Sequence, residues 1–161
     1  MNYKILVGVL IMLKLVENGD IFNSDCQYLV NPVNTVGVMG KGLALGFKNK
    51  FPDNFKKYRK YCKSGEFTVG KLLIISENNK KIVNFPTKLH WKNKSEINYI
   101  LEGLEKLKTA IEKYNIKSIA MPKLGCGLGG LDWNIVYSEI TKWHNQLDKQ
   151  IVKDLVVEIY I

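Results

Sequence analysis

Apolar positions recur along this chain with two different periods, and the period switches several times. Apolar runs of strand length, bounded by turn residues, lie at 13–17, 28–31, 70–76, 81–86, 117–122 and 154–161. Segments whose pattern indicates helices lie at 40–50, 51–65, 95–111 and 131–147. Strands that alternate with helices over short links predict a layered α/β domain, with a mixed sheet covered on both faces.

Single residues predict some of the boundaries between these elements. Pro52 and Asp53 are typical of a first helical turn, and Gly65 is typical of the residue after a last turn. Ser95 is expected to cap the following long helix. The polar run 77–81 between two strands predicts a β-hairpin.

The first residues carry an ambiguous apolar run. Ile5 to Leu13 follow Lys4, as in a short signal peptide, but no small-residue cleavage site follows and a strand is the favoured interpretation. Met12 is an alternative start of translation. We therefore expect residues 1–11 to be an N-terminal extension or an extra strand, and residues 12–161 to form the main domain.

Composition adds a preference for an anionic partner. The 161 residues are 46% hydrophobic and 24% charged, which excludes disordered and disulfide-scaffold classes. The 24 basic residues against 15 acidic ones give a formal charge of +9. This excess favours nucleic acid, nucleotides or acidic membranes, although a lysine-rich genome explains it equally well. Arg59 is the only arginine, so the charge does not indicate reading of a base sequence.

Cysteine and histidine positions give no sign of a metal centre or a disulfide framework. Cys26, Cys62 and Cys126 are odd in number and never at CxxC spacing, and His90 and His144 are the only histidines. We expect no metal, no cofactor and a cytoplasmic location. No apolar run reaches membrane-spanning length, so we expect no membrane partner.

Two glycine-rich segments follow predicted strands, where open α/β sheets bind ligands. Residues 30–47 contain Gly37, Gly40 and Gly42, and residues 121–133 contain four further glycines. Neither segment matches the common nucleotide-binding fingerprints. Both can form an anion cradle, because glycine allows a positive φ and a helix N-terminus follows. Two ordinary turns are the alternative, but two such loops together favour a bound diphosphate.

Polar residues beside these loops have open alternatives. Lys88 leaves a buried strand, where a lowered pKa suits an acid, base or nucleophile, but a solvated lysine is the simpler interpretation from composition alone. Asp20 either binds a base amino group or caps a turn. Asn31 and Asn34 either hold ribose hydroxyls or are structural. Trp91 is the tryptophan best placed to stack on a base.

Six segments, taken in chain order, resemble the macro domain family. They are GDIF, LVNPVNTVGVMGKGLALGFK, FPDNFKKY, GKLLIIS, IVNFPTKLHW and MPKLGCGLGGLDW. VNTVGVMGKGLA, NFPTKLHW and LGCGLGGLDW are more narrowly similar to the DarG-type branch, antitoxins that remove ADP-ribose from thymidine in DNA. The resemblance implies a three-layer α/β/α fold, a mixed and mostly parallel central sheet, and an ADP-ribose cleft between the two glycine loops.

The resemblance also implies residue roles. Lys88 and Asn34 are expected to be catalytic, which reverses the compositional interpretation of Lys88. Asp20 is expected to bind the adenine amino group and Tyr160 to stack on adenine. The residues expected to bind ADP-ribose are Asp20, Ile21, Asn31, Thr35, Gly37, Val38, Met39, Gly40, Lys41, Gly42, Thr87, Gly125, Cys126, Gly127, Leu128, Gly129, Gly130 and Tyr160.

The implied activity is hydrolysis of the N-glycosidic bond between ADP-ribose and thymine. The implied partners are ADP-ribosylated DNA and a cognate DNA ADP-ribosyltransferase toxin, and we expect a monomer. Similar macro domains act on O-acetyl-ADP-ribose, ADP-ribose 1″-phosphate or glutamate-linked ADP-ribose, or bind ADP-ribose without turnover. Terminal glycohydrolases of the family pair their lysine with a catalytic aspartate, at a position that here is Gly129.

Overall fold

Seven strands form one sheet in the order β1-β2-β7-β6-β3-β5-β4 in this computed structural model, which describes residues 4–6 and 9–161. The strands are β1 (Lys4–Leu6), β2 (Val9–Val16), β3 (Tyr28–Asn34), β4 (Leu73–Glu77), β5 (Lys80–Lys88), β6 (Ser118–Pro122) and β7 (Val156–Tyr160). The strands from β2 to β5 in this order pair in parallel, and β1 and β4 pair antiparallel at the two edges. The mixed, mostly parallel sheet is therefore confirmed.

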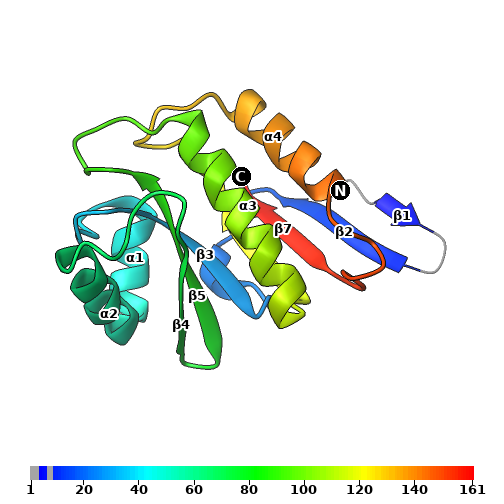
Figure 1. Cartoon of the computed structure of the whole chain (residues 1–161), viewed down its shortest axis with the longest axis horizontal. Coiled ribbons are helices and arrows are strands. Elements are labelled where there is room, and N and C mark those ends of the chain that lie inside the picture. Colours follow the sequence, from blue (N-terminus) through cyan, green and yellow to red (C-terminus); the bar gives the residue numbers. More distant parts are fainter. Residues whose placement is uncertain (1–3, 7–8) are drawn as a thin grey trace.

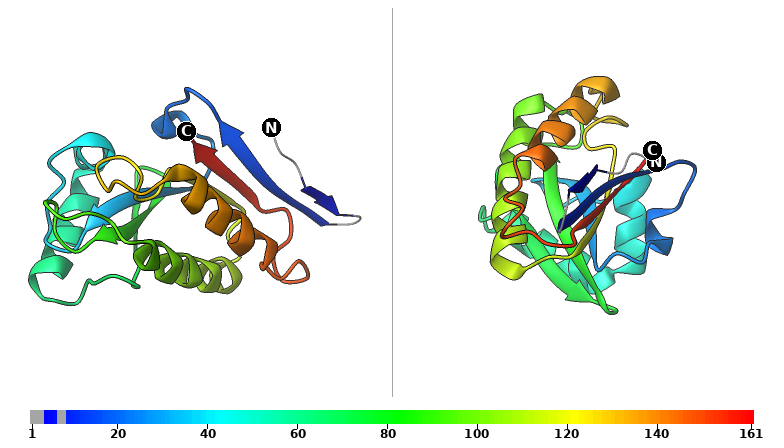
Figure 2. Two further views of the ribbon diagram at one scale, coloured as in Figure 1. Left: turned by 90° about the horizontal axis from the view of Figure 1, so that it is seen from above. Right: turned by 90° about the vertical axis from the view of Figure 1, so that its right-hand side faces the viewer.

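Helices cover both faces of the sheet and complete the predicted three layers (Figure 1). They are α1 (Gly42–Lys50), α2 (Pro52–Lys63), α3 (Ile97–Tyr114) and α4 (Trp133–Asn145), with a short 3-10 turn η1 (Ile21–Asn23). The right-hand view of Figure 2 shows α3 and α4 on one side of the sheet and α1 on the other. Within the described residues, we find no helix whose length and apolar character would let it cross a membrane.

The apolar stripe of α3 explains how this helix packs. Ile100, Leu104 and Ile111 are buried on the face that contacts β5. Gly103 lies on the same face, and a Cβ at this position would clash with the ring of Phe85 in β5. The glycine therefore lets the helix approach the sheet closely, at a small cost in helix propensity.

The structure tests several predictions about single turns, caps and boundaries. The hairpin is confirmed: Asn78 and Asn79 join β4 to β5 with φ values of 50° and 60°, as two-residue hairpin turns require. The Ser95 cap is wrong, because Glu96 is the N-cap residue of α3. β2 begins at Val9 and so crosses the predicted boundary after residue 11. The division at that residue stays a prediction, and residues 1–3 and 7–8 lie outside the described residues.

The sheet splits at its carboxyl edge between β3 and β6. These two strands pair only at Tyr28 with Ile119 and Leu29 with Ala120, although β3 continues to Asn34. Beyond the split β3 pairs with β5, and β6 pairs with β7. A split between neighbouring parallel strands is where α/β sheets bind ligands.

Candidate functional site

Two loops leave the sheet on either side of this split. The first loop, residues 35–41, joins β3 to α1, and the second loop, residues 123–131, follows β6 and precedes α4. Positive φ values between 57° and 83° occur in or beside these loops at Gly37, Gly42, Gly125 and Gly130. Gly40 has no positive φ, contrary to expectation. The loops therefore have the backbone conformation that favours glycine, next to two helix N-termini.

Asn34 folds the first loop around its own side chain. Its Oδ1 accepts hydrogen bonds from the Val36 amide at 3.1 Å and the Val38 amide at 3.3 Å, and its Nδ2 donates to the Val38 carbonyl at 2.7 Å. The buried hydroxyl of Tyr58 lies 2.7 Å from the Asn34 carbonyl and 2.9 Å from its Oδ1. Asn34 thus has a structural role in the loop, and its catalytic role stays a prediction.

Asn31 and Met39 lie beneath the first loop. Asn31 is fully buried; its Nδ2 donates to Asn84 Oδ1 at 3.2 Å and lies 3.7 Å from Met39 Sδ. Met39 packs with Val33 and Tyr58 in a small apolar cluster. Both side chains are buried beneath the loop, and their contacts with ADP-ribose stay predictions. Both anchor the loop from below.

Lys88 ends β5 beside the first loop, paired in register with Asn34. Its Nζ donates to the Trp91 carbonyl at 3.4 Å. Burial, reinforced by the cation of Lys94, holds the pKa of Lys88 below its usual value. An amine with a lowered pKa exchanges a proton more readily near neutral pH, which suits an acid or base.

Ser95 supports the second loop. Its amide donates to the Gly129 carbonyl at 3.0 Å, and the Leu131 amide donates to the Gly125 carbonyl at 3.0 Å. A Cβ at Gly129 would clash with Ser95 Oγ and with the Gly125 carbonyl oxygen. This position therefore admits no side chain, and an aspartate-assisted mechanism has no residue here to use. The sequence pattern predicted Ser95 as the cap of the following helix and did not indicate its contact with Gly129.

Cys126 and Gly127 complete the second loop in different ways. Cys126 Sγ donates to the Leu124 carbonyl at 3.4 Å, and burial raises the pKa of its thiol. A neutral, packed thiol argues against a nucleophile. Gly127 faces open space, with nothing within 4 Å of a Cβ at this position.

A pocket of about 350 Å³ lies at the carboxyl ends of β2 and β7. Its lining consists of Gly19, Asp20, Ile21, Leu43, Pro122, Tyr160 and Ile161. Asp20 accepts a hydrogen bond from the Phe22 amide at 2.9 Å and so caps η1. The turn-capping role of Asp20 is thus present, and its adenine contact stays a prediction, as does stacking by Tyr160.

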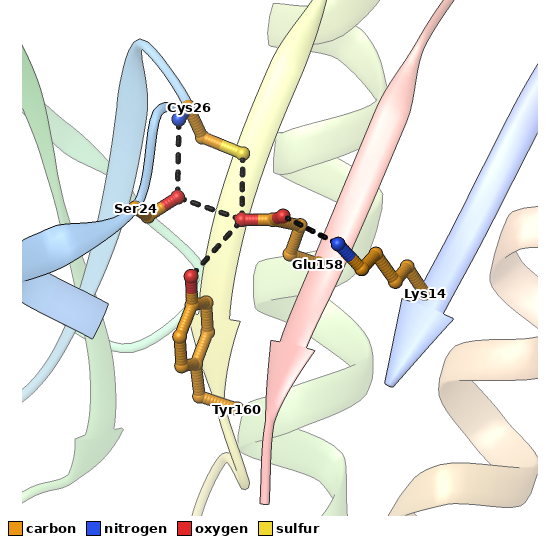
Figure 3. A network of polar contacts seen from close by, with 5 residues as sticks. All are labelled: Lys14, Ser24, Cys26, Glu158 and Tyr160. Carbon is orange, nitrogen blue, oxygen red and sulfur yellow. Dashed lines mark hydrogen bonds and ion pairs between the residues drawn. The ribbon is translucent and has the colours of Figure 1, made fainter. Parts of the chain in front are cut away.

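A polar network behind the pocket fixes Tyr160 (Figure 3). Glu158 Oε1 accepts hydrogen bonds from Ser24 Oγ at 2.7 Å, Cys26 Sγ at 3.2 Å and the Tyr160 hydroxyl at 3.1 Å. Lys14 Nζ lies 3.7 Å from Oε2. Burial alone would raise the pKa of Glu158, but these partners outweigh it and hold the pKa below the usual value. A carboxylate inside an otherwise apolar strand was the only sequence sign of this network.

Strand order places these parts in a row along one edge. The pocket lies at β2 and β7, the two loops follow β6 and β3, and Lys88 ends β5. β7 and β5 are three strand spacings apart, or about 14 Å where the strands are paired, and farther apart at the split edge. The edge therefore suits an elongated ligand with a ring at one end, phosphates in the middle and its reacting group at Lys88. Among the described residues, no three His, Cys, Asp or Glu side chains gather where they would hold a metal ion.

Comparison with known proteins agrees with this geometry. The sequence model of the macro domain family matches residues 30–140. The chain belongs to the macro domain family. This membership explains the three layers, the split sheet and the two glycine loops together.

Three similarities are more specific. The DNA ADP-ribosyl glycohydrolase of Mycobacterium tuberculosis is 46% identical over 134 residues, which cover 81% of this chain and 38% of that protein. The solved macrodomain of Mycobacterium tuberculosis DarG has a TM-score of 0.86 and 43% identity, covering 93% of this chain and 97% of that one. Thermosipho africanus DarTG in complex with ADP-ribose has a TM-score of 0.80 and 40% identity, covering 91% of this chain and 41% of that one.

The chain spans about two fifths of the length of the curated relatives that are named DNA ADP-ribosyl glycohydrolases. The Thermosipho protein is named a DNA ADP-ribosyl transferase-DNA ADP-ribosyl glycohydrolase fusion protein.

Proposed function

We propose that this chain is a glycohydrolase that removes ADP-ribose from thymidine in DNA. The observation that carries the proposal is the row formed by the pocket, the two glycine loops and Lys88 at the carboxyl edge of the sheet. The names of the relatives described above support DNA as the substrate. The formal charge of +9 agrees with a polyanionic substrate.

The chemistry required is cleavage of the bond between the anomeric carbon and a thymine nitrogen. As this bond breaks, positive charge develops on the sugar, and the leaving base needs a proton. The ammonium group of Lys88 supplies that proton or a hydrogen bond to the opened ribose. Water supplies the hydroxyl that adds to the anomeric carbon, and the remaining proton of water either restores the Lys88 ammonium group or goes to the leaving thymine. A positioned acid contributes about 10²- to 10⁴-fold to the rate. Loops that are already folded hold the diphosphate and ribose with little reorganisation.

Two further properties belong to this proposal. A cognate DNA ADP-ribosyltransferase attaches the ADP-ribose that this chain removes, and the two proteins form a toxin–antitoxin pair. The expected cytoplasmic location and monomeric state fit such a role and stay predictions.

The test is turnover of a single-stranded oligonucleotide that carries one ADP-ribosylated thymidine, by the wild type and by Lys88→Ala. We expect Lys88→Ala to lose activity about 10²-fold or more and to keep its affinity for ADP-ribose in calorimetry. Lys81→Ala is the matched control, because Lys81 lies at the amino end of the same strand. We expect this control to keep wild-type turnover.

Other substrates serve as arms of the same assay. If the chain turns over O-acetyl-ADP-ribose, ADP-ribose 1″-phosphate or a glutamate-linked substrate faster than the oligonucleotide, that compound and not DNA is its substrate. Binding of ADP-ribose without any turnover would make the chain a reader. Full activity of Lys88→Ala would remove this lysine from the mechanism.

A further inference from the structure

Trp91 is unusually exposed for a tryptophan. It lies in the loop between β5 and α3, and 51% of its surface is accessible, whereas Trp143 in α4 is 3% exposed and packs in the core. Val36, Val38, Leu89 and Leu128 are further exposed large apolar residues in this loop and the two glycine loops. Exposed apolar groups that gather around a cleft mark an interaction surface.

The loop that carries Trp91 is fixed at both ends. The hydroxyl and the amide of Thr35 donate to the Leu89 carbonyl at 2.7 and 3.3 Å, which ties the loop to the first glycine loop. The Ser95 amide donates to Gly129 in the second glycine loop. The loop that carries Trp91 therefore lies between the two glycine loops and is tied to both of them.

Neighbouring side chains hold the indole ring in place. The ring of His90 lies against it with centroids 5.1 Å apart and an interplanar angle of 31°. His90 Nδ1 in turn accepts a hydrogen bond from the Lys92 amide at 3.1 Å. Lys92 Nζ lies 5.1 Å from the centre of the Trp91 ring. An exposed aromatic ring beside a cation provides a stacking platform for a nucleobase.

The charge around Trp91 has one sign. Residues 35–41, 88–95 and 123–131 contain five lysines and no acidic residue. The nearest acidic residues in sequence, Glu96 and Asp132, are the N-cap residues of α3 and α4. A diphosphate carries only two phosphate groups, whereas a DNA strand adds one phosphate per nucleotide along such a surface.

From this arrangement, and resting on the proposed function, we infer that Trp91 stacks on a base next to the modified thymidine in single-stranded DNA. Lys92 and Lys94 then contact the phosphates of that strand. Single-stranded DNA fits because its bases present a free face to the ring, whereas bases inside a duplex are already stacked on both faces. The surface thus selects a nucleic-acid substrate over a free nucleoside.

The test compares two substrates, ADP-ribosylated thymidine as a free nucleoside and the same group within a single-stranded pentanucleotide. The measured quantity is the ratio of kcat/KM for the pentanucleotide to kcat/KM for the nucleoside. We expect Trp91→Ala to lower this ratio about tenfold, within the range found for loss of one stacked base, and Trp91→Phe to restore most of it. An unchanged ratio in Trp91→Ala would overturn the inference.

Tyr114→Ala is the matched control. Tyr114 is 57% exposed, has Lys113 Nζ 5.2 Å from its ring centre and lies at the far end of α3, about 26 Å along the helix. We expect its ratio to equal that of the wild type. An equal fall in both variants would show a general loss of surface aromatics and would also overturn the inference.

A second measurement separates this inference from the proposed function. Binding of an unmodified single-stranded pentanucleotide should quench the fluorescence of the wild type, and Trp91→Phe should remove that quenching. If the wild type hydrolyses neither substrate, the proposed function fails, and the fluorescence titration alone tests whether Trp91 stacks on a base. Absence of quenching in the wild type would then refute the stacking contact.

Discussion

Replacing Gly129 by alanine is expected to destabilise the second glycine loop, whereas the same change at Gly127 is not. A Cβ at Gly129 would lie closer than 3.0 Å to both Ser95 Oγ and the Gly125 carbonyl oxygen. The backbone oxygen cannot rotate away, so Gly125 or residue 129 must shift. At Gly127 a Cβ meets nothing within 4 Å. Neither glycine has a positive φ, so the comparison isolates packing.

The magnitude follows from three contributions. Overpacking costs about 1–3 kcal/mol. Strain on the hydrogen bond from Leu131 to Gly125 adds about 1 kcal/mol. Replacing glycine by alanine also lowers the conformational entropy of the unfolded chain, which stabilises both variants by about 0.4–1 kcal/mol. The entropy contribution cancels between the two variants, so Gly129→Ala should have a free energy of unfolding about 2–4 kcal/mol below that of Gly127→Ala, which corresponds to a melting temperature about 5–12 °C lower.

Urea unfolding followed by tryptophan fluorescence measures this difference, and calorimetry with ADP-ribose follows its effect on the loop. We expect Gly129→Ala to bind ADP-ribose more weakly than the wild type, because the loop that is predicted to hold the diphosphate must shift. Equal stability of the two alanine variants would refute the packing argument. Removing the Ser95 side chain as well, in a Gly129→Ala, Ser95→Gly double variant, should recover only part of the loss, since the clash with Gly125 remains.

Two further predictions concern the supports of the site. Tyr58→Phe should lower the free energy of unfolding by about 1 kcal/mol and weaken ADP-ribose binding, because the first loop loses the hydroxyl that holds Asn34. Denaturant unfolding measures this loss. Tyr61→Phe is the control, because Tyr61 is exposed on the same helix. Glu158→Gln should cost about 1 kcal/mol at pH 7. Since folding lowers the pKa of Glu158, its contribution is complete above the usual value of 4.5 and is lost as the pH falls through the folded pKa. The gap between wild type and variant should narrow as the pH falls below 4.5; a gap that does not narrow there would contradict the assigned network.

Local patterns gave most of the elements but assigned some polar residues to the wrong partner. Ser95 precedes a helix and reads as its cap, yet its amide bonds to Gly129, 34 residues later. Asn31 has a ligand role and a structural role as open alternatives beside a glycine loop, and its side chain bonds to Asn84 from a neighbouring strand. These partners come from distant parts of the chain, so short-range spacing cannot reveal them.

The sequence alone determined the alternation of strands and helices, the hairpin at Asn78 and Asn79, and the two glycine loops, because each depends on residues near one another in the chain. Only the tertiary structure decided that β3 lies between β5 and β6, and that the sheet splits there. That strand order brings Lys88 and both loops to one edge. It results from burial of apolar faces across the whole chain, a property that no single segment carries.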